Sequence, residues 1–160
     1  AIFVDQPEPR DTRIEYAFSM HDAWQLICEH DRMYPNAFAK LIFCPHPEKR
    51  NQNVALPASV EIRAFKELIP SEFSIVFGVS STAMVECFLM GKSVVSIQPG
   101  HSDENIDPLS RQGKIPRISS DAQLLDLLAN IDHLQPSISK NPFEGSLERL
   151  IKFMEERSSV

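Results

Sequence analysis

A histidine between two prolines, His46, directly follows an apolar run of the sequence. Pro45 and Pro47 restrict the backbone on either side of it, because each proline ring fixes its own φ and limits the residue before it. An imidazole held in this way can donate a hydrogen bond to a phosphate oxygen or act as an acid. A rigid turn with a solvent-facing histidine is the alternative that the tripeptide alone leaves open.

Three consecutive hydroxyl side chains, Ser80, Ser81 and Thr82, stand where an apolar run gives way to a helical pattern. The first turn of a helix leaves backbone N–H groups unpaired and carries a partial positive charge. Hydroxyls beside those N–H groups add donors, so the segment suits a phosphate. Plain N-capping of the helix is the alternative, although three hydroxyls exceed what one cap needs.

Glu86 lies about one turn into the same predicted helix, where its carboxylate could accept hydrogen bonds from ribose hydroxyls. A surface glutamate on a partly exposed helix is the alternative. The polar loop at residues 101–105 follows the next predicted strand and could contact a sugar or a diphosphate. Three cations could offset phosphate charge, although a solvated role is the simpler reading of each: Lys49, Arg50 and Arg63.

Short apolar runs alternate with amphipathic segments along the chain and predict the elements that must position these residues. Strands are expected at residues 2–5, 41–44, 60–63, 74–79, 93–97 and 115–118, and helices at about 21–33, 83–90, 121–131 and 143–157. Residues 101–111 are polar and loop-like. Strands that are apolar on both faces and alternate with helices predict an α/β fold with a doubly wound, Rossmann-like parallel sheet. Ligands of such sheets bind beyond the carboxyl ends of the strands, where both motifs fall.

The composition fits one globular domain over residues 1–160, with 42% hydrophobic and 24% charged residues. A formal net charge of -6 argues against a general nucleic-acid binder. The three cysteines, Cys28, Cys44 and Cys87, sit among apolar residues and are expected to be reduced in a cytosolic core. No apolar run approaches the roughly 20 residues that a membrane span needs. Because the chain begins directly in a predicted strand, we interpret it as part of a longer protein, cut at a domain boundary.

Several common fingerprints are missing from the sequence. It has no Walker loop and no G-x-G-x-x-G motif. The segment at residues 78–82 lacks the second glycine of a G-x-S-x-G nucleophile elbow, which weakens a serine-hydrolase interpretation. The five histidines show no zinc spacing, so no metal site is expected.

Over roughly residues 1–133, these motifs follow one another in an order that resembles the C-terminal, donor-binding half of GT-B-fold glycosyltransferases. The likeness is to bacterial sialyltransferases and polysialyltransferases, and to capsule and teichoic-acid transferases that use cytidine-nucleotide donors. By this resemblance His46 and Pro47 match the HP motif, and residues 80–82 match the Ser-Ser/Thr motif; both motifs contact the donor's nucleotide and phosphate. Glu86 matches the acidic residue that holds the ribose in many GT-B enzymes. Residues 91–95 are similar to the G-K-P-V-V of GT-B enzymes and UDP-sugar 2-epimerases, with Ser93 in place of the proline.

The resemblance implies a CMP- or CDP-linked sugar as co-substrate, no further cofactor, and a role in surface-polysaccharide synthesis. His46 would stabilise the leaving phosphate. The implied location is cytoplasmic, or peripheral at the inner face of the membrane. In the sialyltransferase-like families an N-terminal half binds the acceptor and supplies the general base, and no residue of this sequence replaces it convincingly. We therefore expect the chain to bind donor without completing transfer and to need that half as a partner. Half of a UDP-sugar 2-epimerase-like enzyme, or a non-catalytic Rossmann-like module, remains an alternative.

Overall fold

The computed structural model describes residues 1–6, 18–49, 56–100 and 105–131. The terminal helix expected at residues 143–157 lies outside these ranges. The strands are β1 (Ile2–Val4), β2 (Ile42–Cys44), β3 (Glu61–Ile62), β4 (Ile75–Gly78), β5 (Ser93–Ile97) and β6 (Arg117–Ile118). The helices are α1 (Met20–Met33), α2 (Thr82–Leu89), α3 (Pro108–Arg111) and α4 (Asp121–Ala129), with 3-10 turns η1 (Pro47–Lys49), η2 (Phe65–Glu67) and η3 (Pro70–Glu72).

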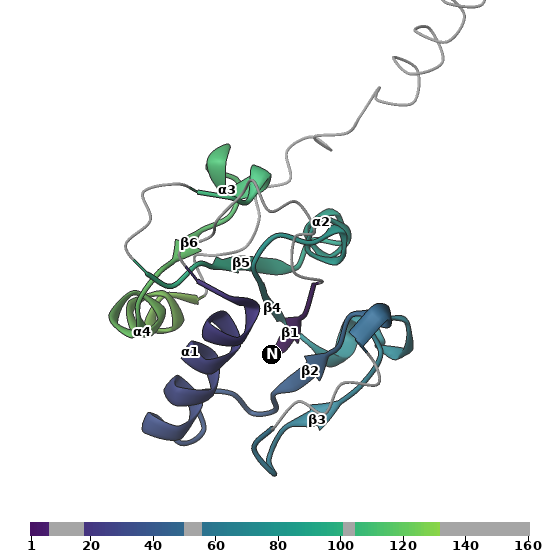
Figure 1. Cartoon of the computed structure of the whole chain (residues 1–160), viewed down its shortest axis with the longest axis vertical. Helices are drawn as coiled ribbons and strands as arrows, with labels where there is room; N and C mark the ends of the chain where they lie inside the picture. The colour runs from purple at the N-terminus through teal and green to yellow at the C-terminus, as the bar shows by residue number, and fades with distance from the viewer. Residues whose placement is uncertain (7–17, 50–55, 101–104, 132–160) are drawn as a thin grey trace, which may run out of the picture.

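The described strands form one parallel sheet with the order β3-β2-β1-β4-β5-β6 (Figure 1). From β1 the chain moves outward through β2 to β3, and from β4 it moves outward in the opposite direction through β5 to β6. Strand order therefore reverses between β1 and β4, where Val4 pairs with Gly78. This arrangement confirms the α/β, doubly wound parallel sheet that the sequence predicts.

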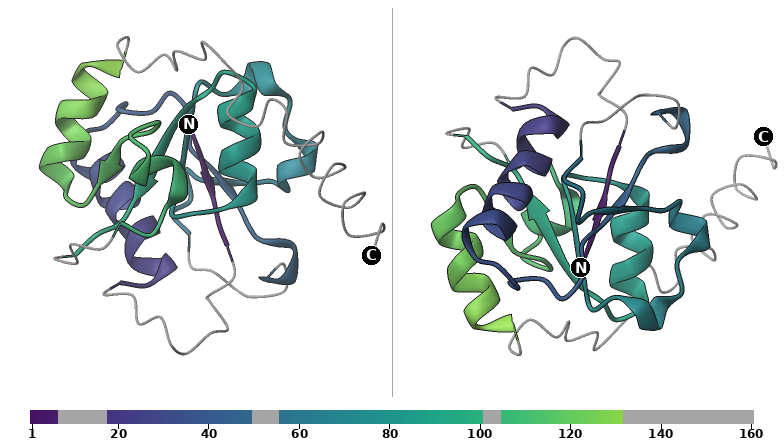
Figure 2. Two further views of the ribbon diagram at one scale, coloured as in Figure 1. Left: turned by 90° about the horizontal axis from the view of Figure 1, so that it is seen from above. Right: turned by 90° about the horizontal axis from the view of Figure 1, so that it is seen from below.

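Helices cover both faces of the sheet, with α1 and α4 on one side and α2 on the other (Figure 2). Alternate strand residues point to opposite faces, so Phe3 joins the cluster with α1 and α4, while Ile2 and Val4 join the cluster with α2 and α3. Trp24 of α1 is buried between Phe3 and Phe43, with ring centroids 5.2 and 4.9 Å away, as expected of a core residue. Both faces of the central strands β1, β2 and β4 are covered, which explains why these strands show no polar alternation.

The prediction that residues 101–111 form a loop is wrong for the last four of these residues. Residues 108–111 form the single helical turn α3, in which Asp107 is the N-cap and Pro108 takes the first helical position. An aspartate followed by proline favours this start, since proline lacks the N–H that the first turn cannot use. Leu109 of α3 is buried against the α2 side of the sheet.

Gly78 ends β4 beneath the start of α2, and its missing side chain sets how closely the two can approach. A Cβ at this position would lie 2.7 Å from Met84 Sδ and 2.8 Å from Val4 Cγ2. Both distances are shorter than real Cβ contacts allow, so the glycine lets the first turn of α2 pack directly over the β1–β4 pair. The helix N-terminus is thereby brought to the point where strand order reverses.

All three cysteines are unpaired, with Cys44 and Cys87 buried and Cys28 half-buried. Burial raises the pKa of each thiol to about 12. At neutral pH these side chains are therefore protonated and unreactive. Among the described residues, no helix is both long and apolar enough to cross a membrane.

Candidate functional site

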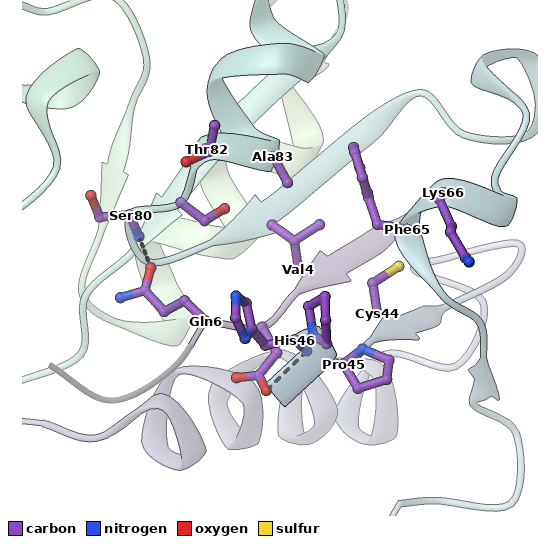
Figure 3. A pocket seen from close by; sticks show the side chains of 13 residues that line it. Val4, Gln6, Cys44, Pro45, His46, Phe65, Lys66, Ser80, Thr82 and Ala83 are labelled. Carbon is purple, nitrogen blue, oxygen red and sulfur yellow. Dashed lines mark hydrogen bonds between the residues drawn. The ribbon is translucent and has the colours of Figure 1, made fainter. Parts of the chain in front are cut away.

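A cleft of about 600 Å³ opens at the carboxyl ends of β1, β2 and β4 (Figure 3). Its walls come from the segments that leave these strands and from η2: Val4, Asp5, Gln6, Cys44, Pro45, His46, Pro47, Phe65, Lys66, Ser80, Ser81, Thr82 and Ala83. The cleft therefore occupies the crevice at the switch point, where doubly wound sheets bind their ligands.

The N-terminus of α2 forms one wall of the cleft. Ser81 is the N-cap, and its Oγ accepts a hydrogen bond from the Met84 backbone N–H at 3.3 Å. Accepting that bond leaves the hydroxyl proton of Ser81 available to a ligand. The first turn of α2 contains no acidic residue, so its partial positive charge is not neutralised by its own side chains. Thr82, the first helical residue, is exposed and adds a second hydroxyl.

Gln6 follows β1 and reaches across the switch point to the turn before α2. Its Oε1 accepts a hydrogen bond from the Ser80 backbone N–H at 2.9 Å. Because a backbone N–H can only donate, the amide oxygen must face Ser80, and the Nε2 group keeps its two N–H donors for other partners. The carboxyl end of β1 is thereby tied to the start of α2.

His46 enters the cleft from the end of β2. Its Nδ1 accepts a hydrogen bond from the Glu48 backbone N–H at 3.3 Å. In the neutral ring this contact places the proton on Nε2, which makes Nε2 the donor toward a ligand. The backbone N–H of His46 lies 3.5 Å from Asp5 Oδ2, a contact that links the end of β2 to the end of β1. The prolines and these two contacts fix the direction of the imidazole.

The other wall of the cleft is mainly apolar and includes Phe65 and Lys66 of η2. Phe65 is half-buried and presents an aromatic ring, while Lys66 is exposed and carries a positive charge. The cleft thus combines a polar end, at the start of α2, with an apolar end, at η2. Such a cleft could take a ligand that has a negatively charged part and an apolar part.

Five of the residues that the sequence marks as candidates line this one cleft: His46, Pro47, Ser80, Ser81 and Thr82. Glu86 is exposed on α2 and is not among the lining residues, so its assignment to a ribose stays a prediction. Arg63 also lies outside the lining set and forms ion pairs with Glu61 at 2.5 Å and Glu72 at 2.7 Å. Arg50 and residues 101–104 lie outside the described ranges, as does the side chain of Lys49.

Four lining residues carry polar or aromatic side chains that the sequence analysis did not mark as candidates: Asp5, Gln6, Phe65 and Lys66. Gln6 directly follows a predicted strand, so the rule that selected His46 and Ser80 could have selected it as well. Phe65 and Lys66 follow the very short strand β3, and only the folded chain shows that η2 turns back over the cleft.

Comparison with known proteins gives one structural likeness. No protein-family model matches the chain, and no curated protein matches it. Among solved structures, the chain is similar to Thermosulfurimonas dismutans KpsC, a beta Kdo 2,4 transferase, with 18% sequence identity and a TM-score of 0.41. The match covers 60% of this chain and 32% of that chain, so the chain spans about a third of that protein's length. At this identity and TM-score the likeness assigns no function.

Proposed function

We propose that the cleft binds the phosphate and nucleoside of a nucleotide-sugar, and that the chain is the donor-binding half of an inverting glycosyltransferase of surface-polysaccharide synthesis. One observation carries the proposal: His46 and the N-terminus of α2 line the same cleft, at the point where strand order reverses. The resemblance in the order of the HP and Ser-Ser/Thr motifs supports the same ligand class.

The polar end of the cleft suits the leaving phosphate of a glycosyl transfer. Negative charge grows on that phosphate as the bond to the sugar breaks, and groups already aimed at it lower the barrier. Three groups that line the cleft would serve this role: the backbone N–H groups at the start of α2, the Ser81 hydroxyl and His46 Nε2–H. His46 would act through hydrogen bonding or proton donation, so it is the proposed catalytic residue.

The apolar end of the cleft suits the nucleoside. Phe65 offers a ring for stacking, and Lys66 offers a cation beside it. We propose a cytidine nucleotide, CMP- or CDP-linked, on the strength of the motif pair. The acceptor and the general base would come from a further domain, so the chain by itself would bind donor without completing transfer.

Isothermal titration of the chain with CMP, CDP, UMP and UDP tests the proposal, with a His46→Ala variant alongside. We expect a cytidine nucleotide to bind most tightly. The His46→Ala substitution should lower the affinity for that nucleotide about 10-fold, as loss of one charge-assisted hydrogen bond predicts. His21→Ala is the matched control, because His21 is exposed on α1 and does not line the cleft.

Other outcomes of the titration would contradict the proposal or favour a different function. A preference for UDP would favour a UDP-sugar 2-epimerase-like half or a transferase with a uridine donor. Equal affinity in wild type and His46→Ala would contradict the role of the imidazole. Absence of binding by every nucleotide at millimolar concentration would contradict the donor-site proposal for this chain and favour a non-catalytic module.

A further inference from the structure

The peptide group that joins Val79 to Ser80 is the step from β4 towards the N-terminus of α2. Its N–H, which belongs to Ser80, donates a hydrogen bond to Gln6 Oε1 at 2.9 Å (Figure 3). Its C=O, which belongs to Val79, accepts a hydrogen bond from Ser96 Oγ at 2.6 Å. Gln6 follows β1 and Ser96 belongs to β5, and these two strands are the neighbours of β4 in the sheet. One planar group is therefore held at both of its polar ends.

The two ends of this peptide group face different surroundings. The peptide is trans, so its N–H and C=O point in opposite directions. The N–H is directed at Gln6, which lines the cleft, whereas the C=O is directed at Ser96, which is fully buried and does not line it. If the peptide turned over, the Val79 oxygen would lie on the Gln6 side, at the wall where we propose that phosphate binds. A carbonyl oxygen carries partial negative charge and only accepts hydrogen bonds, so it would repel a phosphate there.

A buried amide sets the direction of the Ser96 hydroxyl. Gln98 is fully buried, and its Oε1 accepts a hydrogen bond from the Ile106 backbone N–H at 3.1 Å. A backbone N–H can only donate, so the Gln98 atom that it contacts is the oxygen, and Nε2 is the donor. Gln98 Nε2 donates to Ser96 Oγ at 2.8 Å and to Asn105 Oδ1 at 2.9 Å. Because Ser96 Oγ accepts this bond, and the Val79 oxygen can only accept, the one hydroxyl proton of Ser96 is committed to Val79.

The other end of this network is fixed by the backbone around α3. The Asp107 backbone N–H donates to Asn105 Oδ1 at 3.2 Å, and Asn105 Nδ2 donates to Ser110 Oγ at 2.9 Å. Each of the two amide side chains thus has its oxygen identified by a backbone N–H donor, which leaves the network one arrangement of donors and acceptors. A buried network whose members are satisfied is rigid, so the fold itself sets the direction of the Ser96 hydroxyl.

We propose that Ser96 is a positioning residue of the cleft: its buried hydroxyl holds the Val79 carbonyl in the interior and thereby keeps the donor side of the following peptide towards the ligand. This inference rests on the proposed function, since it takes the ligand at the start of α2 to be a phosphate. It assigns an influence on binding to a residue that does not line the cleft and that belongs to a neighbouring strand.

The test compares wild type with Ser96→Ala, Ser96→Cys and Val95→Ala. Two quantities are measured: affinity for CDP by calorimetry, and the rate of amide hydrogen exchange at Ser80 in the ligand-free chain by NMR. Ser96→Ala removes the donor to Val79, so the peptide is held at one end only. We expect it to weaken CDP binding about 5-fold, as loss of one hydrogen bond predicts, and to speed exchange at Ser80. Ser96→Cys keeps a weak donor and should fall between wild type and Ser96→Ala in both measurements.

Val95→Ala is the matched control, because Val95 precedes Ser96 in β5, is buried, and belongs to the cluster with α1 and α4 on the face of the sheet away from α2. It should lower the melting temperature through loss of packing without changing affinity or exchange at Ser80. A Ser96→Ala variant with wild-type affinity, or with wild-type exchange at Ser80, would overturn the inference, as would equal changes in Val95→Ala. If wild type binds no CDP, the proposed function fails, while exchange at Ser80 still decides whether Ser96 holds the peptide. If Ser96→Ala does not fold, Ser96→Cys gives the same test, because its side chain leaves no empty space.

Discussion

Replacement of Ser81 by aspartate is expected to leave the fold intact and to weaken nucleotide binding about 100-fold or more. Aspartate is as good an N-cap as serine, so the hydrogen bond to the Met84 backbone N–H should persist. A negative charge at a helix N-terminus also interacts favourably with the helix dipole. The same charge would stand where the ligand phosphate is proposed to bind, and two like charges about 4 Å apart repel by about 4 kcal/mol at an effective dielectric constant of about 20.

The matched control for Ser81→Asp is Ser120→Asp at the N-cap of α4. Both variants add one negative charge at a helix start, but only Ser81 lines the cleft. Thermal unfolding should show both variants as stable as wild type, while calorimetry shows loss of binding in Ser81→Asp alone. Undiminished CDP binding by a folded Ser81→Asp variant would mean that the phosphate does not sit at α2.

Replacement of Gly78 by valine is expected to lower the free energy of unfolding by about 3 kcal/mol. A Cβ at this position already lies within 2.8 Å of both Met84 and Val4, and the two methyl groups of valine would add to the overlap. The surrounding side chains are buried and cannot move into solvent, so α2 or β1 must shift. Urea denaturation monitored by circular dichroism measures the change.

Ser74→Val is the control for Gly78→Val, because Ser74 is exposed just before the same strand and has room for a larger side chain. It should change stability by no more than about 0.5 kcal/mol. Met84→Ala in the Gly78→Val background should recover part of the loss, because it removes one of the two clashing groups. A Gly78→Val variant as stable as wild type would show that close approach of α2 to β4 is not required.

The strands β1, β2 and β4 could be predicted from sequence because each is a short run of buried residues. Ile42–Cys44 and Ile75–Gly78 have no polar residue that would obscure the pattern. The start of α2 could be predicted for a similar reason, since Ser81 provides the cap chemistry that a helix N-terminus needs. The turn α3 was missed because its signal, Asp107-Pro108, lies in a polar stretch that resembles a loop.

Half of the cleft could be predicted, and the other half depends on tertiary contacts. The parallel sheet places the ends of β2 and β4 at one edge, which is enough to bring His46 and Ser81 together. Lys66 reaches the cleft only because η2 folds back after β3, a path that no local pattern specifies. Gln6 is distant in sequence from Ser80, and its contact with the Ser80 backbone N–H exists only in the folded chain.

The central claim is that a phosphate-containing nucleotide binds at the carboxyl ends of β1, β2 and β4. Titration of isotope-labelled chain with CDP, followed residue by residue in amide NMR spectra, tests this most directly. The account predicts that the largest shifts fall on Gln6, His46, Ser81 and Thr82, with little change at the opposite end of the sheet around Lys92. Shifts concentrated around Lys92, or an unchanged spectrum at millimolar CDP, would contradict it.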